Sequence, residues 1–150
     1  MIGDELPDED HFVRYAKPTG IREDSTVDGS EFRLRLNRPD DTGVSVQWLE
    51  CYHDLPKADQ LAQVRIVSRL TLKKRGRFAE LNIGTVKRHV SEELEAMQIV
   101  HWPLEANDKF PDDPSHAEIT GLPPGDSDQA ALIGDMIAQC IIQTHPGLAE

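Results

Sequence analysis

The sequence predicts an α+β protein, with a mixed or mainly antiparallel sheet of about five to six strands and helices on one of its faces. Three observations support this prediction. Several short segments alternate apolar and polar residues, two longer segments repeat apolar residues at helical spacing, and strands and helices do not alternate as they do in parallel α/β folds. The 150 residues match the size of one domain. We therefore predict one α+β domain over residues 11–150, preceded by a flexible acidic tail, residues 1–10.

Strand segments are marked by apolar residues at every second position, the pattern of a half-buried strand. Residues 32–36 alternate Phe and Leu with arginines, and the alternation resumes at residues 44–48 after a polar loop. We expect these two segments to form a hairpin, and residues 98–102 and 116–120 to pair with each other. The expected strands are residues 11–15, 32–36, 44–48, 77–83, 98–102 and 116–120.

Three helices are expected. The two main helices, about residues 55–72 and about residues 127–143, repeat apolar residues every three or four positions. Asp54 is a suitable N-cap for the first of them. Ser91 is followed by two glutamates, which are favourable in a first helical turn, so a short third helix is expected over about residues 91–97.

Composition predicts a cytoplasmic protein that does not enter a membrane. The first residues lack the basic and apolar regions of a signal peptide, and the apolar runs are too short to span a bilayer. The two cysteines, Cys51 and Cys140, lie in separate apolar stretches and are expected to be free thiols. Motifs for a nucleotide, a cofactor or a metal are absent from the sequence, so we predict no cofactor.

The charge of this acidic chain is segregated along the sequence. The net charge is −11, yet residues 64–88 carry eight basic residues and one acidic residue, a balance of +7. Arg65, Arg69 and Lys73 follow one another at intervals of four, so they form one row on the first expected helix. Lys74, Arg75 and Arg77 continue the row into the following loop and strand. We call these six residues the basic helix–loop surface.

This surface predicts a small non-enzymatic binding or accessory protein that recognises an acidic partner. A protein, or a second copy of this chain, is the expected partner, because acidic stretches elsewhere in the sequence complement the surface. An RNA-binding module is an alternative. It is disfavoured by the balance of −18 over the rest of the chain and by an aromatic content of only 5%.

The histidines provide a second alternative, a small metal-dependent hydrolase. If residues 98–102 pair with residues 116–120, His101 and His116 can face each other, with Glu118 on the same side as His116. Two imidazoles and a carboxylate are suitable ligands for Zn²⁺ or Fe²⁺, and they can also act as a general acid and base. Surface or hydrogen-bonded structural histidines are the competing interpretation, and it is the one we favour.

A second small group of polar residues lies in the first expected strand. His11, Arg14 and Tyr15 follow Asp10 and are a possible anion-binding trio, in which the Arg14 guanidinium pairs with a phosphate or a carboxylate. The competing interpretation is that Arg14 neutralises neighbouring acids while Tyr15 packs with its hydroxyl at the surface.

Overall fold

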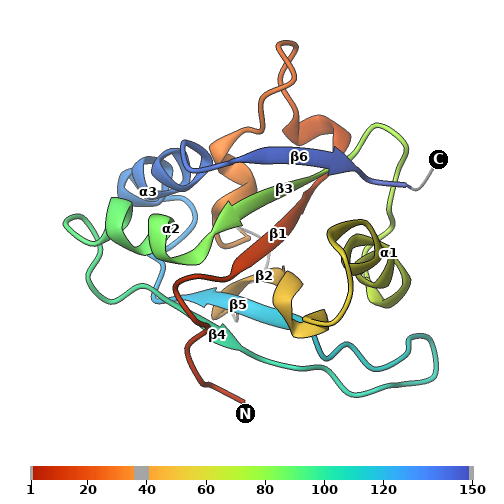
Figure 1. Ribbon diagram of the computed structural model, residues 1–150. Coiled ribbons are helices and arrows are strands. Elements are labelled where there is room, and N and C mark those ends of the chain that lie inside the picture. Colours follow the sequence, from red (N-terminus) through yellow and green to blue (C-terminus); the bar gives the residue numbers. More distant parts are fainter. Residues whose placement is uncertain (1, 36–40, 149–150) are drawn as a thin grey trace.

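The computed structural model describes residues 2–35 and 41–148 (Figure 1). It confirms the α+β class: within these residues, three α-helices pack on a six-stranded antiparallel sheet of order β4-β5-β2-β1-β3-β6. The strands are β1 (His11–Ala16), β2 (Gly43–Trp48), β3 (Arg77–Asn82), β4 (Gln98–His101), β5 (His116–Thr120) and β6 (Gln143–Pro146). The helices are α1 (Lys57–Val67), α2 (Ile83–Val90) and α3 (Asp128–Ala138), with 3-10 turns η1 (Pro18–Gly20), η2 (Gly29–Phe32) and η3 (Leu49–Tyr52).

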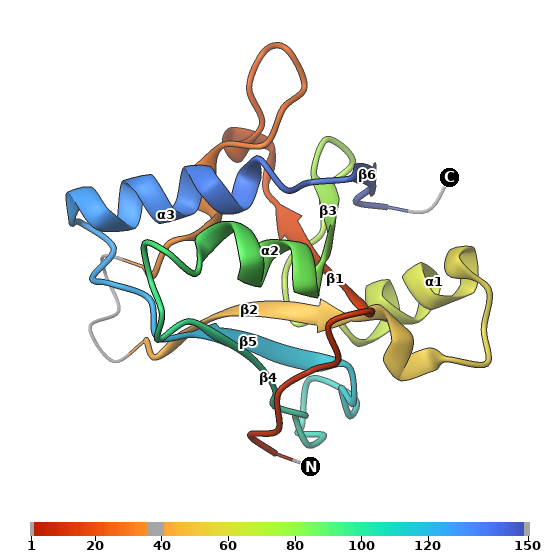
Figure 2. The same ribbon diagram turned by 60° about the vertical axis from the view of Figure 1, so that its left-hand side comes forward.

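Helices cover both faces of the sheet, rather than the single face that the sequence predicts (Figures 1 and 2). On the face of α2 and α3, Phe12 and Leu81 belong to the larger hydrophobic core. On the opposite face, α1 packs over a smaller core that includes Val13 and Phe78. Because side chains alternate across a strand, successive residues of β1 enter different cores. The centre of the sheet is therefore buried on both sides.

Two expected helices are shorter in the structure. The first was expected to reach residue 72, but α1 ends at Val67, and the Ser68 side chain accepts a hydrogen bond from the Leu70 N–H. Such a local side-chain bond competes with helical hydrogen bonding, which accounts for the early end. The last was expected to reach residue 143, but α3 ends at Ala138, and Gln143–Pro146 instead pairs with β3 as an edge strand.

The short helix lies earlier than the predicted residues 91–97. It is α2, Ile83–Val90, which begins directly after β3, and the Asn82 side chain accepts a hydrogen bond from the Thr85 N–H as its N-cap. The apolar residues of α2 are fully buried, so packing favours this position over the polar residues that follow. The prediction of a helix over residues 91–97 was wrong. It relied on Ser91 as a capping residue, although the residues that follow do not form an apolar helical face that could be buried.

The hairpin between residues 32–36 and 44–48 is also not formed. Phe32 ends the 3-10 turn η2, which begins where the Asp28 side chain accepts a hydrogen bond from the Ser30 N–H, and β2 pairs instead with β1 and β5. Residue 36 of that expected strand lies outside the described residues. The predicted pairing of residues 98–102 with residues 116–120 is confirmed, as β4 and β5.

The N-terminal segment, which the sequence predicts to be a flexible tail, lies along β4. The Gly3 and Leu6 N–H groups donate to main-chain oxygens of β4, at 2.8 Å from His101 O and 2.9 Å from Ile99 O. The Leu6 side chain is buried in the larger core. The segment therefore covers one edge of the sheet. Among the described residues, no helix is long and apolar enough to cross a membrane.

Candidate anion-binding site

A wedge opens in the sheet where β1 and β2 separate. The two strands pair only at Phe12 with Trp48 and at Val13 with Gln47. Beyond these positions β1 continues to pair with β3 as far as Ala16, while β2 is paired with β5. The part of β1 that follows Val13 therefore has a sheet neighbour on one side only. The candidate site lies over the gap between the two strands, and residues of both strands line it.

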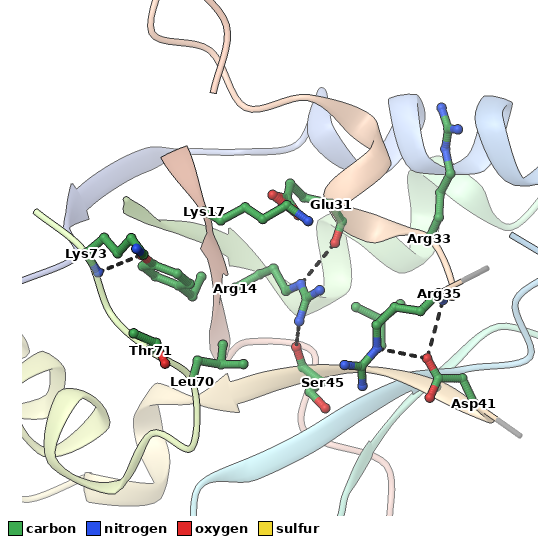
Figure 3. A pocket seen from close by; sticks show the side chains of 13 residues that line it. Arg14, Lys17, Glu31, Arg33, Arg35, Asp41, Ser45, Leu70, Thr71 and Lys73 are labelled. Atoms are coloured by element: carbon green, nitrogen blue, oxygen red, sulfur yellow. Dashed lines mark hydrogen bonds and ion pairs between the residues drawn. The ribbon is translucent and has the colours of Figure 1, made fainter. Parts of the chain in front are cut away.

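Arg14 bridges this wedge (Figure 3). Its Nη1 donates to the main-chain oxygen of Ser45 on β2 at 2.8 Å, and its Nε donates to the main-chain oxygen of Glu31 at 2.9 Å. The guanidinium thus satisfies the Ser45 oxygen, which an N–H group of β1 would satisfy in a continuous sheet, and it also ties η2 to β1. Burial lowers the pKa of Arg14 and the Glu31 carboxylate opposes this shift, but an arginine remains charged at neutral pH.

A cavity of about 360 Å³ lies over the wedge, and most charged residues around it are cationic. Five cationic and two acidic residues line it, a balance of +3. Lys17, Arg33 and Lys73 form no side-chain hydrogen bond or ion pair within residues 2–35 and 41–148, whereas Arg35 pairs with Asp41 at 3.1 Å. The charged lining residues are Arg14, Lys17, Arg33, Arg35 and Lys73 with Glu31 and Asp41. We call this lined space the cationic cleft.

Glu31 provides a buried counter-charge beside Arg14. Its side chain is buried, and its Oε1 has no hydrogen-bond partner within the described residues. The carboxyl group packs against Gly20, where any larger residue would collide with it. Glu31 and Asp41 are the two acidic residues among the seven charged residues that line the cleft, so positive charge is in surplus there.

Tyr15 fixes the rim of the cleft on the α1 side. Its hydroxyl oxygen accepts a hydrogen bond from the Lys73 N–H at 2.8 Å, and its ring contacts the Phe78 ring. Gly76 allows this arrangement, because a Cβ at that position would overlap the Tyr15 hydroxyl. The chain from Ser68 to Lys73 is thereby held beside the opening of the cleft (Figure 3). We call residues 68–73 the strap.

The basic helix–loop surface is divided in the structure. Because α1 ends at Val67, Arg69 and Lys73 do not extend a helical row. Arg65, Arg69 and Arg77 donate to main-chain oxygens: Arg65 to Pro146 at 2.7 Å, Arg69 to Glu105 at 2.6 Å and Arg77 to Thr144 at 3.4 Å. The side chains of Lys73, Lys74 and Arg75 have no such bonds within the part of the chain that the structure describes. Three of the six cations thus cross-link the fold.

The structure does not bring the histidine group together. His101 pairs with Ala117, so it lies on the opposite face of the sheet from His116 and Glu118. The His101 ring bonds to the Pro114 oxygen at 2.7 Å, and the His116 ring bonds to the Trp102 oxygen at 2.7 Å and to Ser45 Oγ at 3.1 Å. Among the described residues, no three His, Cys, Asp or Glu side chains are grouped to hold a metal ion.

Of the predicted anion-binding trio, only Arg14 and Tyr15 line the cleft. His11 instead bonds to Glu50 through its ring at 2.7 Å. Lys17, Arg33 and Arg35 were not predicted as site residues. In the sequence, Arg33 and Arg35 alternate with apolar residues. This pattern could have indicated a basic site, but it was interpreted as a half-buried strand with a basic outer face.

The cleft combines guanidinium and ammonium donors with a half-enclosed shape, which suits a phosphate or a carboxylate better than a neutral group. Comparisons with models of protein families, with curated proteins and with solved structures found no match.

Proposed function

We propose that this chain is a non-enzymatic binding protein that recognises an acidic partner by holding an anionic group of that partner in the cationic cleft. The observation that carries the proposal is the balance of +3 around one cavity in a chain of net charge −11. Lys17, Arg33 and Lys73 line it without an acidic partner of their own within the described residues. Cations left unpaired around a concave site attract and retain anions.

Fewer residues of the basic helix–loop surface take part in recognition than the sequence predicts. Arg65, Arg69 and Arg77 have structural hydrogen bonds, so they are not free to recognise a partner. Lys74 and Arg75 are exposed beside Lys73 and extend the positive potential from the cleft toward solvent. Recognition then depends on cations from three separate segments of the chain.

Isothermal titration calorimetry with inorganic pyrophosphate at low salt tests this proposal. The wild type is expected to bind the probe, and Lys17→Glu is expected to weaken binding about 10-fold or more, because it converts an attractive charge beside Arg14 into a repulsive one (Figure 3). Binding by the wild type is also expected to weaken as salt is added.

Arg88→Glu is the control, because it makes the same charge change on α2, outside the cleft. It should bind pyrophosphate nearly as well as the wild type. The proposal is wrong if the wild type does not bind the probe, or if both variants lose affinity equally, since equal loss would report net charge rather than a site.

A further inference from the structure

A second cavity of about 320 Å³ adjoins the cationic cleft on the α1 side of the sheet. Tyr15, Arg35, Ser45 and Leu70 line both cavities, so the two spaces meet beneath the strap. A ligand held in the cleft can therefore extend into the second cavity. Each volume alone is near the lower end of small-molecule sites, and together they fall well within that range.

The charges around the second cavity are more nearly balanced than those around the cleft, because Arg35 and Arg69 line it together with Asp113. Its walls include the apolar side chains of Val13, Phe78, Leu70 and Leu104. These side chains favour an apolar group, because burying apolar surface is favourable and non-directional. The second cavity therefore adds apolar wall to that which Val44 and Leu70 provide in the cleft.

Several polar side chains of the second cavity already have partners, although the buried Arg69 Nε has none within the described residues. The Gln47 amide donates to Asp113 at 2.8 Å and to Ser115 at 2.9 Å. The two nitrogens of the His116 ring are bonded, and Arg69 donates to the Glu105 oxygen at 2.6 Å. A polar group of the ligand placed against Gln47 or His116 would have to break one of these bonds, whereas an apolar group would not.

We propose that the cleft and the second cavity together bind a small phosphate monoester with a compact apolar body. The phosphate occupies the cationic cleft, and the apolar body occupies the second cavity. This inference rests on the proposed function and names the ligand class of the same site.

The charges favour a phosphate over a carboxylate in the cleft. A phosphate monoester carries a charge of about −1.5 to −2 and three acceptor oxygens, while a carboxylate carries one charge and two oxygens. The cleft has a balance of +3, so the phosphate neutralises more of it. The second cavity, lined by Arg35 and Arg69 with the buried carboxylate of Asp113, has a smaller surplus of positive charge, so the phosphate is favoured in the cleft.

Calorimetric titrations with inorganic phosphate, 1-naphthyl phosphate and 1-naphthoate test the inference. The wild type is expected to bind 1-naphthyl phosphate at least about 10-fold more tightly than inorganic phosphate, because the ring buries apolar surface. It is also expected to bind 1-naphthyl phosphate more tightly than 1-naphthoate. Leu70→Ser is expected to reduce the advantage of 1-naphthyl phosphate over inorganic phosphate several-fold.

Ile66→Ser is the matched control, since Ile66 is an equally apolar residue, 64% exposed on α1, that lines neither cavity. It should leave the affinity ratio unchanged. The inference is overturned if the ring adds no affinity, if 1-naphthoate binds as tightly as 1-naphthyl phosphate, or if both serine variants behave alike. In those cases pyrophosphate binding that depends on Lys17 would leave the proposed function standing, whereas a wild type that binds no anion would overturn both.

Discussion

Arg14 and Glu80 are two charged residues held by atoms from distant segments of the chain. Arg14 bridges β1, β2 and η2. Glu80 is the buried acidic counterpart on β3: it accepts hydrogen bonds from Lys57 at 2.9 Å, from His145 at 2.8 Å and from Gln143 at 3.2 Å. Burial alone would raise the pKa of Glu80, but the bonds from Lys57, His145 and Gln143 outweigh it and lower the pKa. Glu80 thereby ties α1 and β6 to the sheet.

At the residue scale, we predict that Glu80→Gln lowers the free energy of unfolding by about 1–3 kcal/mol at neutral pH. The figure is below that for a fully buried pair because Lys57 is about half exposed. A lowered folded-state pKa means that the stabilisation is present above the ordinary pKa of 4.5 and is lost as the pH falls through the lowered value. Urea unfolding of both proteins across this pH range measures the difference.

The gap in stability between the wild type and Glu80→Gln should therefore narrow as the medium is acidified. A gap that stays constant from neutral to acidic pH would contradict the role assigned to the ionised carboxylate. Asp59→Asn is a suitable control, because it removes an exposed carboxylate from α1, the helix that also carries Lys57, and should change stability little.

At the element scale, β6 is the edge strand of the sheet and pairs with β3. Two arginines bind its main-chain oxygens, Arg65 from α1 and Arg77 from β3. Pro146 removes one N–H group from this strand. Arginine contacts and a proline are features that protect a sheet edge from pairing with another chain. From the sequence, both arginines were predicted to recognise a partner. Their structural role could not be predicted, because the oxygens that they bind lie more than sixty residues away in the chain.

We predict that Arg65→Ala loosens β6 while the rest of the sheet stays intact. The Gly147 N–H donates to the Gly76 oxygen at 2.9 Å, so its amide hydrogen exchange reports the attachment of this segment. Loss of a charged hydrogen bond is expected to accelerate this exchange roughly 5- to 30-fold. Native-state hydrogen exchange followed by NMR measures the change.

Arg75→Ala serves as the control for this prediction, because Arg75 is exposed and has no side-chain bond within the described residues. It should leave the exchange of Gly147 at the wild-type rate. Equal exchange rates in the two variants would refute a structural role for Arg65.

Elements were predictable from the sequence where hydrophobic periodicity is strong, and less so where local polar bonds set their ends. The pairing of β4 with β5 follows from two short alternating segments. Side-chain bonds of Ser68, Asn82 and Asp28 set the end of α1, the start of α2 and the start of η2. Serine, asparagine and aspartate are also common in loops, so composition alone does not show whether such a residue ends a helix or lies in a loop.

At the scale of the whole molecule, the segregated charge of the sequence takes a different arrangement in space. The basic segment 64–88 separates into arginines that cross-link the fold and a few exposed cations. The cationic cleft instead combines residues from three parts of the chain, Arg14 with Lys17, Arg33 with Arg35, and Lys73. Arg14, Tyr15 and Lys73 were predictable as site residues because their types and neighbours suit an anion. Lys17, Arg33 and Arg35 were not, because the wedge depends on where the long-range pairing of β1 with β2 stops.

The most direct test of an anion site in the cationic cleft is a two-dimensional ¹H–¹⁵N NMR titration of the wild type with inorganic pyrophosphate. We expect saturable shifts of the amide signals of residues 14–17, 31–35 and 70–73, which surround the cleft (Figure 3). Residues 87–88 on α2 should shift little. Shifts of similar size at residues 87–88, or unchanged signals around the cleft at saturating probe, would contradict the account.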